Sequence, residues 1–258
     1  MFPDPLPPQI AVAKKAHHQK RGYEFLHQRF GGTYIRDLVY GANDGIITTF
    51  AVVAGVAGAA LSSTVVLVLG FANLLADGLA MALGNYLGTK SEADYIDSER
   101  TMESWEVDHL PQEETAEIRQ IYREKGFSGK DLDRAVSLIT ADKTRWVNEM
   151  MVSELGLTPQ FDAHPGKKGL ATFIAFTTAG LMPLLPYIFS FLLPDFSLFA
   201  FRFSLITTTL SLFLVGSLRT VITRRHWFRS GLDMLFVGGL AATVAYLTGF
   251  VINRTLSP

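Results

Sequence analysis

Five apolar stretches divide the chain, and charged or polar segments separate them. They cover about residues 34–61, 64–88, 169–193, 198–222 and 231–252. A helix of about 20 mostly apolar residues crosses the roughly 30 Å hydrocarbon core of a bilayer. The pattern therefore predicts an all-α membrane protein with five transmembrane helices, of which residues 34–88 hold the first two and residues 158–258 the last three.

The segment between the second and third spans, residues 89–157, has a helical pattern but is too polar for a membrane. No proline occurs from Thr64 to Leu110, so the second span is expected to continue as one helix out of the membrane. Pro111 favours a new helix start, and that helix is expected to end near Lys125. A third helix is expected from about residue 128 to 156. The sequence thus predicts a three-helix insert.

Charge is strongly segregated although the net charge is only −1. Residues 89–157 hold 16 of the 24 Asp and Glu residues against 9 Lys and Arg. Such a block attracts cations and disfavours nucleic acid as a partner. Because the chain has no Cys, a metal would be bound by carboxylate, thioether, imidazole, amide or backbone oxygen.

Basic residues predict the orientation, since Lys and Arg in short connections stay on the cytosolic side. The connection between spans four and five is basic, and the turns after spans one and three contain no Lys or Arg. The arginines of the connection between spans four and five are Arg219, Arg224, Arg225 and Arg229. We therefore expect a multi-pass protein whose N-terminal tail, residues 1–33, and insert are cytosolic. Its C-terminus is expected outside or in a lumen, across a plasma, inner or vacuolar membrane.

Acidic and methionine residues recur at helical spacing within the insert. Three glutamates share one face of the helix that continues from the second span. Two more lie on the next helix, and two methionines and a glutamate lie near the end of the third helix. They are Glu99, Glu103 and Glu106; Glu114 and Glu117; and Met150, Met151 and Glu154. Together they could form multi-carboxylate metal sites that thioether sulfur makes softer than calcium or magnesium sites. The alternative is a solvated acidic surface with two core methionines.

Polar residues also lie inside the first two spans, where ionisable groups are costly and usually functional. Span one carries Asp37, Tyr40, Asp44 and Thr48 on one face, and span two carries Asn73, Asp77, Met81 and Asn85 at successive i+4 steps. Antiparallel packing would bring Asp44 and Asp77 to a similar depth. The two stripes predict a transport pathway, and hydrogen bonding between helices is the alternative.

Glycines recur along span one at positions 41, 45, 55 and 58. Small residues let transmembrane helices approach closely. These glycines therefore indicate either packing against another helix of the chain or a seam between two copies.

Three runs of this sequence resemble the vacuolar iron transporter family. They are YGANDGIITTF at 40–50, LADGLAMALG at 75–84, and the acidic insert that closes on MMVSE at 150–154. The resemblance implies five membrane helices, a homodimer, and proton-coupled export of iron(II), often also manganese(II), from the cytosol. It assigns Asp44 and Met81 to the pathway and the insert's glutamates and methionines to metal binding, except Glu99, which helical spacing alone adds.

Two positions depart from the family pattern. Ala80 stands where a serine is often found, and Asn85 stands where an acidic residue is common. The loss of a carboxylate at the cytosolic mouth affects metal preference and affinity but leaves Asp44, Asp77 and Met81 in place. No permanently bound cofactor is expected, because iron(II) or manganese(II) would be cargo.

Two other functions are alternatives to transport. Glu106 and His109 form a Glu-x-x-His pair, which a membrane-anchored ferritin-like iron oxidase would use, but such a centre normally needs two pairs and the insert has one. A metal-binding scaffold would lack paired intramembrane polar stripes. For a transporter, Asp44 is the expected point of exchange, since one carboxylate binds either a proton or a divalent cation but hardly both.

Overall fold

A computed structural model describes residues 34–158, 164–220 and 226–256 of the chain. All regular secondary structure in these ranges is helical, which confirms the all-α prediction. The predicted N-terminal tail and two of the basic residues after span four, Arg224 and Arg225, lie outside the described residues. The chain forms two compact units, Met1–Asn85 with Gly166–Pro258, and Tyr86–Pro165.

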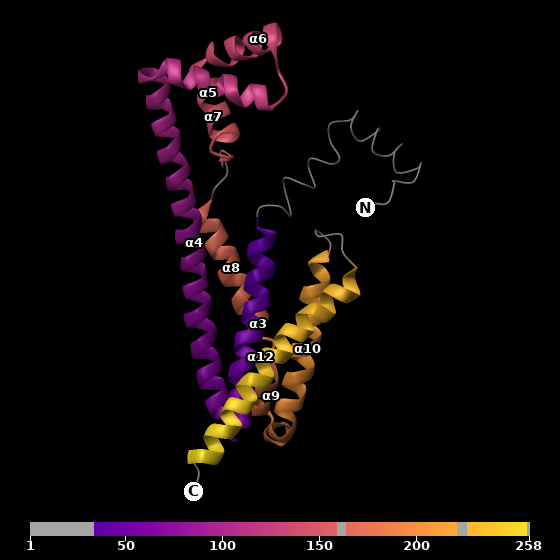
Figure 1. The fold of residues 1–258 in the computed structure, drawn as a ribbon. Coiled ribbons are helices and arrows are strands. Elements are labelled where there is room, and N and C mark those ends of the chain that lie inside the picture. Colours follow the sequence, from indigo (N-terminus) through magenta and orange to yellow (C-terminus); the bar gives the residue numbers. More distant parts are fainter. Residues whose placement is uncertain (1–33, 159–163, 221–225, 257–258) are drawn as a thin grey trace, which may run out of the picture. The chain divides into compact units, whose positions relative to one another are not determined.

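Long and short helices build the described part of the first unit (Figure 1). They are α3 (Ile35–Gly58), the first part of α4 (Ser63–His109), α8 (Pro165–Gly180), α9 (Leu185–Leu192), the short 3₁₀ helix η1 (Pro194–Phe199), α10 (Ala200–Leu218) and α12 (Trp227–Leu256). Within the described residues, four helices are long and apolar enough to cross a membrane, and five if the bent pair α8 and α9 forms one span. The protein is therefore an integral membrane protein with four or five candidate spans.

The predicted third span is not one straight helix. Helices α8 and α9 are bent by 52° at the break between them, and two prolines, Pro183 and Pro186, explain the bend because proline cannot donate a backbone hydrogen bond. Ser204 of α10 donates its hydroxyl to Pro183 O at 2.6 Å. Thr207 donates to Met182 O at 3.2 Å. These hydroxyls satisfy carbonyls that a broken helix leaves without partners inside an apolar bundle.

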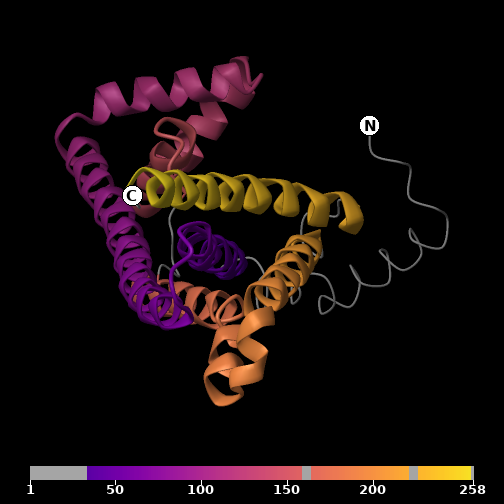
Figure 2. The same cartoon turned by 90° about the horizontal axis from the view of Figure 1, so that it is seen from below.

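Helix α3 lies at the centre of the first unit, with α4, α8, α10 and α12 around it (Figure 2). Its glycines face neighbouring backbone. A Cβ atom at Gly41 would lie 2.8 Å from Thr172 O of α8, and one at Gly58 would clash with Tyr246 O of α12. The glycines of span one therefore serve packing within the chain.

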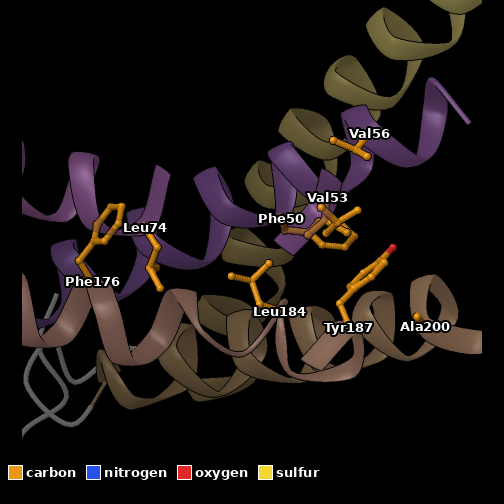
Figure 3. Close-up of a cluster of buried hydrophobic side chains, with 9 residues drawn as sticks. Phe50, Val53, Val56, Leu74, Phe176, Leu184, Tyr187 and Ala200 are labelled. Atoms are coloured by element: carbon orange, nitrogen blue, oxygen red, sulfur yellow. The ribbon is translucent and has the colours of Figure 1, made fainter. Parts of the chain in front are cut away.

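An apolar cluster fills the space between α3 and the bent segment. Figure 3 shows Phe50 and Val53 of α3 facing Leu184 and Tyr187, which lie at the start of α9. Val53 and Leu184 are fully buried. This core fixes α3 against the bend, and so it fixes the height at which the polar residues of α3 lie.

The second unit contains the end of α4 and three further helices. These are α5 (Pro111–Glu124), α6 (Gly129–Thr140) and α7 (Lys143–Ser153). Helix α4 continues to His109 without a break, as predicted, and Pro111 lies in the first turn of α5.

The predicted third helix of the insert, residues 128–156, is wrong as a single helix. It consists of α6 and α7, because the side chain of Asp142 accepts a hydrogen bond from Arg145 N and caps a new helix start. One apolar core joins α4, α5, α6 and α7 in this unit.

Candidate transport pathway and metal-binding insert

Two carboxylates on different helices of the first unit lie within range of each other's charge. Asp44 of α3 and Asp77 of α4 are within electrostatic range of each other, and both side chains are half-buried. Thr48 donates its hydroxyl to the backbone carbonyl of Asp44, at 2.9 Å, and not to its carboxylate. Two acidic groups at one level of an apolar helix bundle form a site that favours a cation or protons.

The polar stripe of α4 faces the bundle. Its four residues are each half-buried, whereas Leu75 and Leu79 on the other side of the helix are more than half exposed. The four half-buried residues of the stripe are Asn73, Asp77, Met81 and Asn85. The amide nitrogen of Asn73 is buried and has no hydrogen-bond partner in the described structure. The helix therefore directs its polar residues inward and its apolar residues outward.

A hydrogen-bonded network closes one end of this stripe. Asn85 Nδ2 lies 3.0 Å from Asp37 Oδ1 and 2.7 Å from Thr172 Oγ1. Asp37 is only 5% exposed, and its second oxygen, Oδ2, has no hydrogen-bond partner. All three side chains line a pocket of about 480 Å³ together with Arg36, Tyr40, Met81 and Gly84.

Met81 has two kinds of contact. It is half-buried and packs against the apolar cluster around Phe50, and it also lines the pocket with Asp37 and Asn85. Its thioether thus lies between the apolar core and the polar stripe. A soft ligand in that position suits iron(II) more than magnesium.

Thr172 and Arg36 are pocket residues that the sequence did not single out. Thr172 belongs to the third transmembrane segment, and a threonine in a helix commonly bonds its own backbone. Arg36 lies in the first turn of α3, where it resembles any basic residue at a membrane surface. Only their position beside Asp37 distinguishes them.

Two glutamates of the insert are buried side by side with other carboxylates. Glu103 of α4 is 5% exposed and Glu114 of α5 is 4% exposed, and one oxygen of each has no hydrogen-bond partner. Burial, followed by the nearby charges of Glu154 and Glu106, raises the pKa of Glu103 to about 7. Burial, followed by the charge of Glu117, raises the pKa of Glu114 to about 7. Both groups are poised to exchange a proton for a cation near neutral pH.

The remaining predicted ligands of the insert lie around this pair or in the core beneath it. Glu99 is within electrostatic range of Glu103. Glu154, which ends α7, interacts with Glu106 and Glu117. In the described part of the chain, no three acidic or histidine side chains already surround one point. The glutamates would have to move together to bind a metal.

Met150 and Met151 are fully buried. Both belong to the apolar core of the second unit with Trp146 and Ile118. They therefore contribute packing in this structure, and a role as ligands would require the end of α7 to rearrange.

Metal binding to the insert should strengthen as the pH rises through about 7, because protons compete for Glu103 and Glu114. The stability of the metal-free insert should change in the opposite direction and decrease as the pH rises. A folded-state pKa above the ordinary 4.5 means that stability falls as the pH rises from about 4.5 to about 7 and is level above. The binding is measured by manganese(II) titrations at several pH values between 5.5 and 8. The full chain carries Asp44→Asn in these titrations, so that the expected exchange site of the pathway does not contribute to the signal.

The matched control carries Glu103→Gln and Glu114→Gln in the same background. These substitutions keep size and hydrogen bonding but remove both titrating groups. The affinity of this variant for manganese(II) should be weaker and almost independent of pH in this range. An unchanged pH profile would show that other groups bind the metal.

The fold and these sites define a class of protein: a helical, multi-pass membrane protein with carboxylates from two helices inside its bundle, and with a second, acidic helical unit. A family model for the VIT family matches residues 35–250 of this chain. The chain therefore belongs to the VIT family.

Individual relatives agree with the family match. A vacuolar iron transporter of Toxoplasma gondii is 38% identical over 232 residues, which cover 88% of this chain and 77% of the relative. Vacuolar iron transporter 1 of Arabidopsis thaliana is 30% identical over 238 residues, covering 92% of this chain and 91% of the relative. A protein of the same name from rice, Oryza sativa, is 31% identical over 235 residues, covering 91% and 90%.

Proposed function

We propose that this protein transports iron(II), and also manganese(II), out of the cytosol in exchange for protons. The observation that carries the proposal is that Asp44 and Asp77, on two helices of an apolar bundle, are half-buried within range of each other's charge. Buried like charges are unfavourable unless a cation or protons compensate them. The relatives that cover most of this chain are named vacuolar iron transporters, which supports iron as the cargo.

Exchange follows from the chemistry of the carboxylates. In this proposal the Asp44 carboxylate binds either a proton or a divalent cation, and an arriving cation displaces the proton because it favours the ionised form. Alternate opening to each side of the membrane then couples the two fluxes. Met81 adds a thioether beside these hard oxygens and favours a transition metal over magnesium.

The insert supplies metal to this pathway. Its buried glutamates raise the local concentration of cations at the cytosolic side. The proposal also includes a homodimer, as the family resemblance implies. The exposed apolar face of α4, which includes Val68, Leu75 and Leu87, is available to lipid or to a second copy.

An iron oxidase is less well supported by the geometry. In the Glu106 and His109 pair, the imidazole stacks on Trp105 with ring centroids 4.4 Å apart, and its Nδ1 lies 2.8 Å from Trp105 O. His109 is thus packed on its own helix. Purified protein in sealed vesicles separates the functions: a transporter accumulates iron(II) inside, an oxidase consumes oxygen without accumulation, and a scaffold does neither.

The cytosolic placement of the insert is tested by labelling single cysteines with a membrane-impermeant thiol reagent in cells. Ser62 lies in the exposed turn between α3 and α4, and Lys130 is exposed in α6. Because the native chain has no Cys, each substitution reports one position. Ser62→Cys should label in intact cells if the protein is in the plasma membrane, and Lys130→Cys only after permeabilisation. The reverse pattern would contradict a cytosolic insert.

A further inference from the structure

Thr172 connects the third transmembrane segment to the mouth of the pathway. It is 1% exposed, and its hydroxyl has two partners. Thr172 Oγ1 donates to Lys168 O at 3.0 Å and accepts from Asn85 Nδ2 at 2.7 Å. A hydroxyl that donates and accepts at once has a fixed direction. Helix α8 therefore determines where the Asn85 amide lies.

Asn85 passes this constraint to Asp37. Its amide nitrogen lies 3.0 Å from Asp37 Oδ1, so one oxygen of that carboxylate is committed to a neutral donor. The other oxygen, Oδ2, is buried without a hydrogen-bond partner. Burying a carboxylate oxygen without a hydrogen-bond partner costs free energy, and a bound cation would offset that cost.

The charges around the pocket limit how tightly it can bind. Asp37 is the one carboxylate among its lining residues, and Arg36 contributes a positive charge to the same lining. Asn85, Thr172 and Tyr40 are neutral. A site with little net charge holds a divalent cation briefly, and ions must leave each site of a conducting path as readily as they enter.

We propose that Thr172 is a positioning residue of the transport pathway, and that Thr172 and Asn85 together hold Asp37 as a low-affinity entry site for a hydrated divalent cation. This inference rests on the proposed transport function. It also explains why a neutral Asn85 is compatible with transport: the amide orients the carboxylate of Asp37, whereas a second carboxylate would bind the cation itself.

The test compares iron(II) uptake by three variants of the full chain in proteoliposomes under anaerobic conditions. Thr172→Val keeps the shape of the side chain but removes the hydroxyl, so the KM for iron(II) should rise about three- to tenfold, the range that one net hydrogen bond supports, while Vmax stays unchanged. Thr172→Ser should restore the wild-type KM. Asn85→Asp should lower both KM and Vmax, because an added carboxylate binds the cation more tightly and releases it more slowly.

Thr178→Val is the matched control. Thr178 lies in the same helix, is exposed, and donates only within its own helix, to Ile174 O at 2.6 Å and to Ala175 O at 3.3 Å. It should transport like the wild type. An unchanged KM in Thr172→Val, an equal rise in Thr178→Val, or wild-type kinetics in Asn85→Asp would each overturn the inference.

The same assay separates this inference from the proposed function. A wild-type protein that accumulates no iron(II) removes the proposed function and the entry site with it. A wild-type protein that transports normally, beside a Thr172→Val variant with an unchanged KM, removes only the role of Thr172. If Thr172→Val fails to fold, the kinetics of Thr172→Ser and Asn85→Asp still decide.

Discussion

Asp44→Asn should reduce both metal flux and coupled proton flux to the level of empty vesicles. The substitution keeps the size and hydrogen bonding of the side chain but removes its charge and its titration. Asp44 is half-buried in the helix bundle and within range of the charge of Asp77, so the substitution removes one of the two carboxylates of the proposed exchange site. Radiolabelled iron(II) uptake and a lumenal pH dye, recorded in the same vesicles, measure the two fluxes.

The protein should still insert and fold, because asparagine fits the space of aspartate and removes an unfavourable charge from the bundle. Size-exclusion chromatography of the purified variant checks this. Asp77→Asn is the variant to compare, since Asp77 is the other carboxylate of the proposed exchange site. If Asp44→Asn retains pH-dependent transport and Asp77→Asn loses it, the coupling site belongs to Asp77.

Among the substitutions described, Gly249→Val should cause the largest decrease in the free energy of unfolding. Gly249 of α12 lies against α3, where an added Cβ would clash with Gly55 O and lie 3.0 Å from Ala59 N. Both are backbone atoms, so no side chain can move aside. The helices would have to separate, and overpacking of this kind costs about 1–3 kcal/mol, occasionally more. Thermal unfolding of the detergent-solubilised protein should show a lower midpoint and a smaller folded fraction.

Gly239→Val is the control in the same helix. An added Cβ at Gly239 has no neighbour within 4 Å, so the substitution should leave the unfolding midpoint near that of the wild type. Equal losses at positions 239 and 249 would show that the close crossing of α3 and α12 does not determine stability.

The sequence predicted most of the membrane unit because hydropathy and helical periodicity carry that information. The apolar runs gave both bounds of α3 and the start of α4 within a few residues, and the absence of proline before Pro111 gave the end of α4. The i+4 spacing from Asn73 to Asn85 placed four polar residues on one face of α4, and the structure turns that face inward. Such patterns depend only on the helix repeat, which is the same in every helix.

The breaks inside helical segments were harder to predict. Pro183 was visible in the sequence, but the length of the third apolar run suggested one span. The bend also depends on Ser204 and Thr207 of α10, which satisfy the carbonyls at the break. Similarly, the separation of α6 from α7 depends on the Asp142 cap, and neither glycine nor proline marks it.

The assembled site was the least predictable part. Thr172 is a pathway candidate only because α8 packs on α3 and α4 at the level of Asp37 and Asn85. The sequence equally permitted Met150 and Met151 to be ligands or core residues. Their complete burial among apolar side chains is a consequence of tertiary packing, which periodicity does not contain.

The central claim, that protons drive metal out of the cytosol, is tested most directly by uphill transport. Proteoliposomes with an acidic interior and equal concentrations of manganese(II) inside and outside have no metal gradient to drive uptake. Metal should accumulate inside while the lumen becomes more alkaline, and collapse of the pH gradient by a protonophore should stop the accumulation. Accumulation that is the same with and without the pH gradient, or no accumulation by protein that equilibrates metal down its gradient, would contradict proton-coupled exchange.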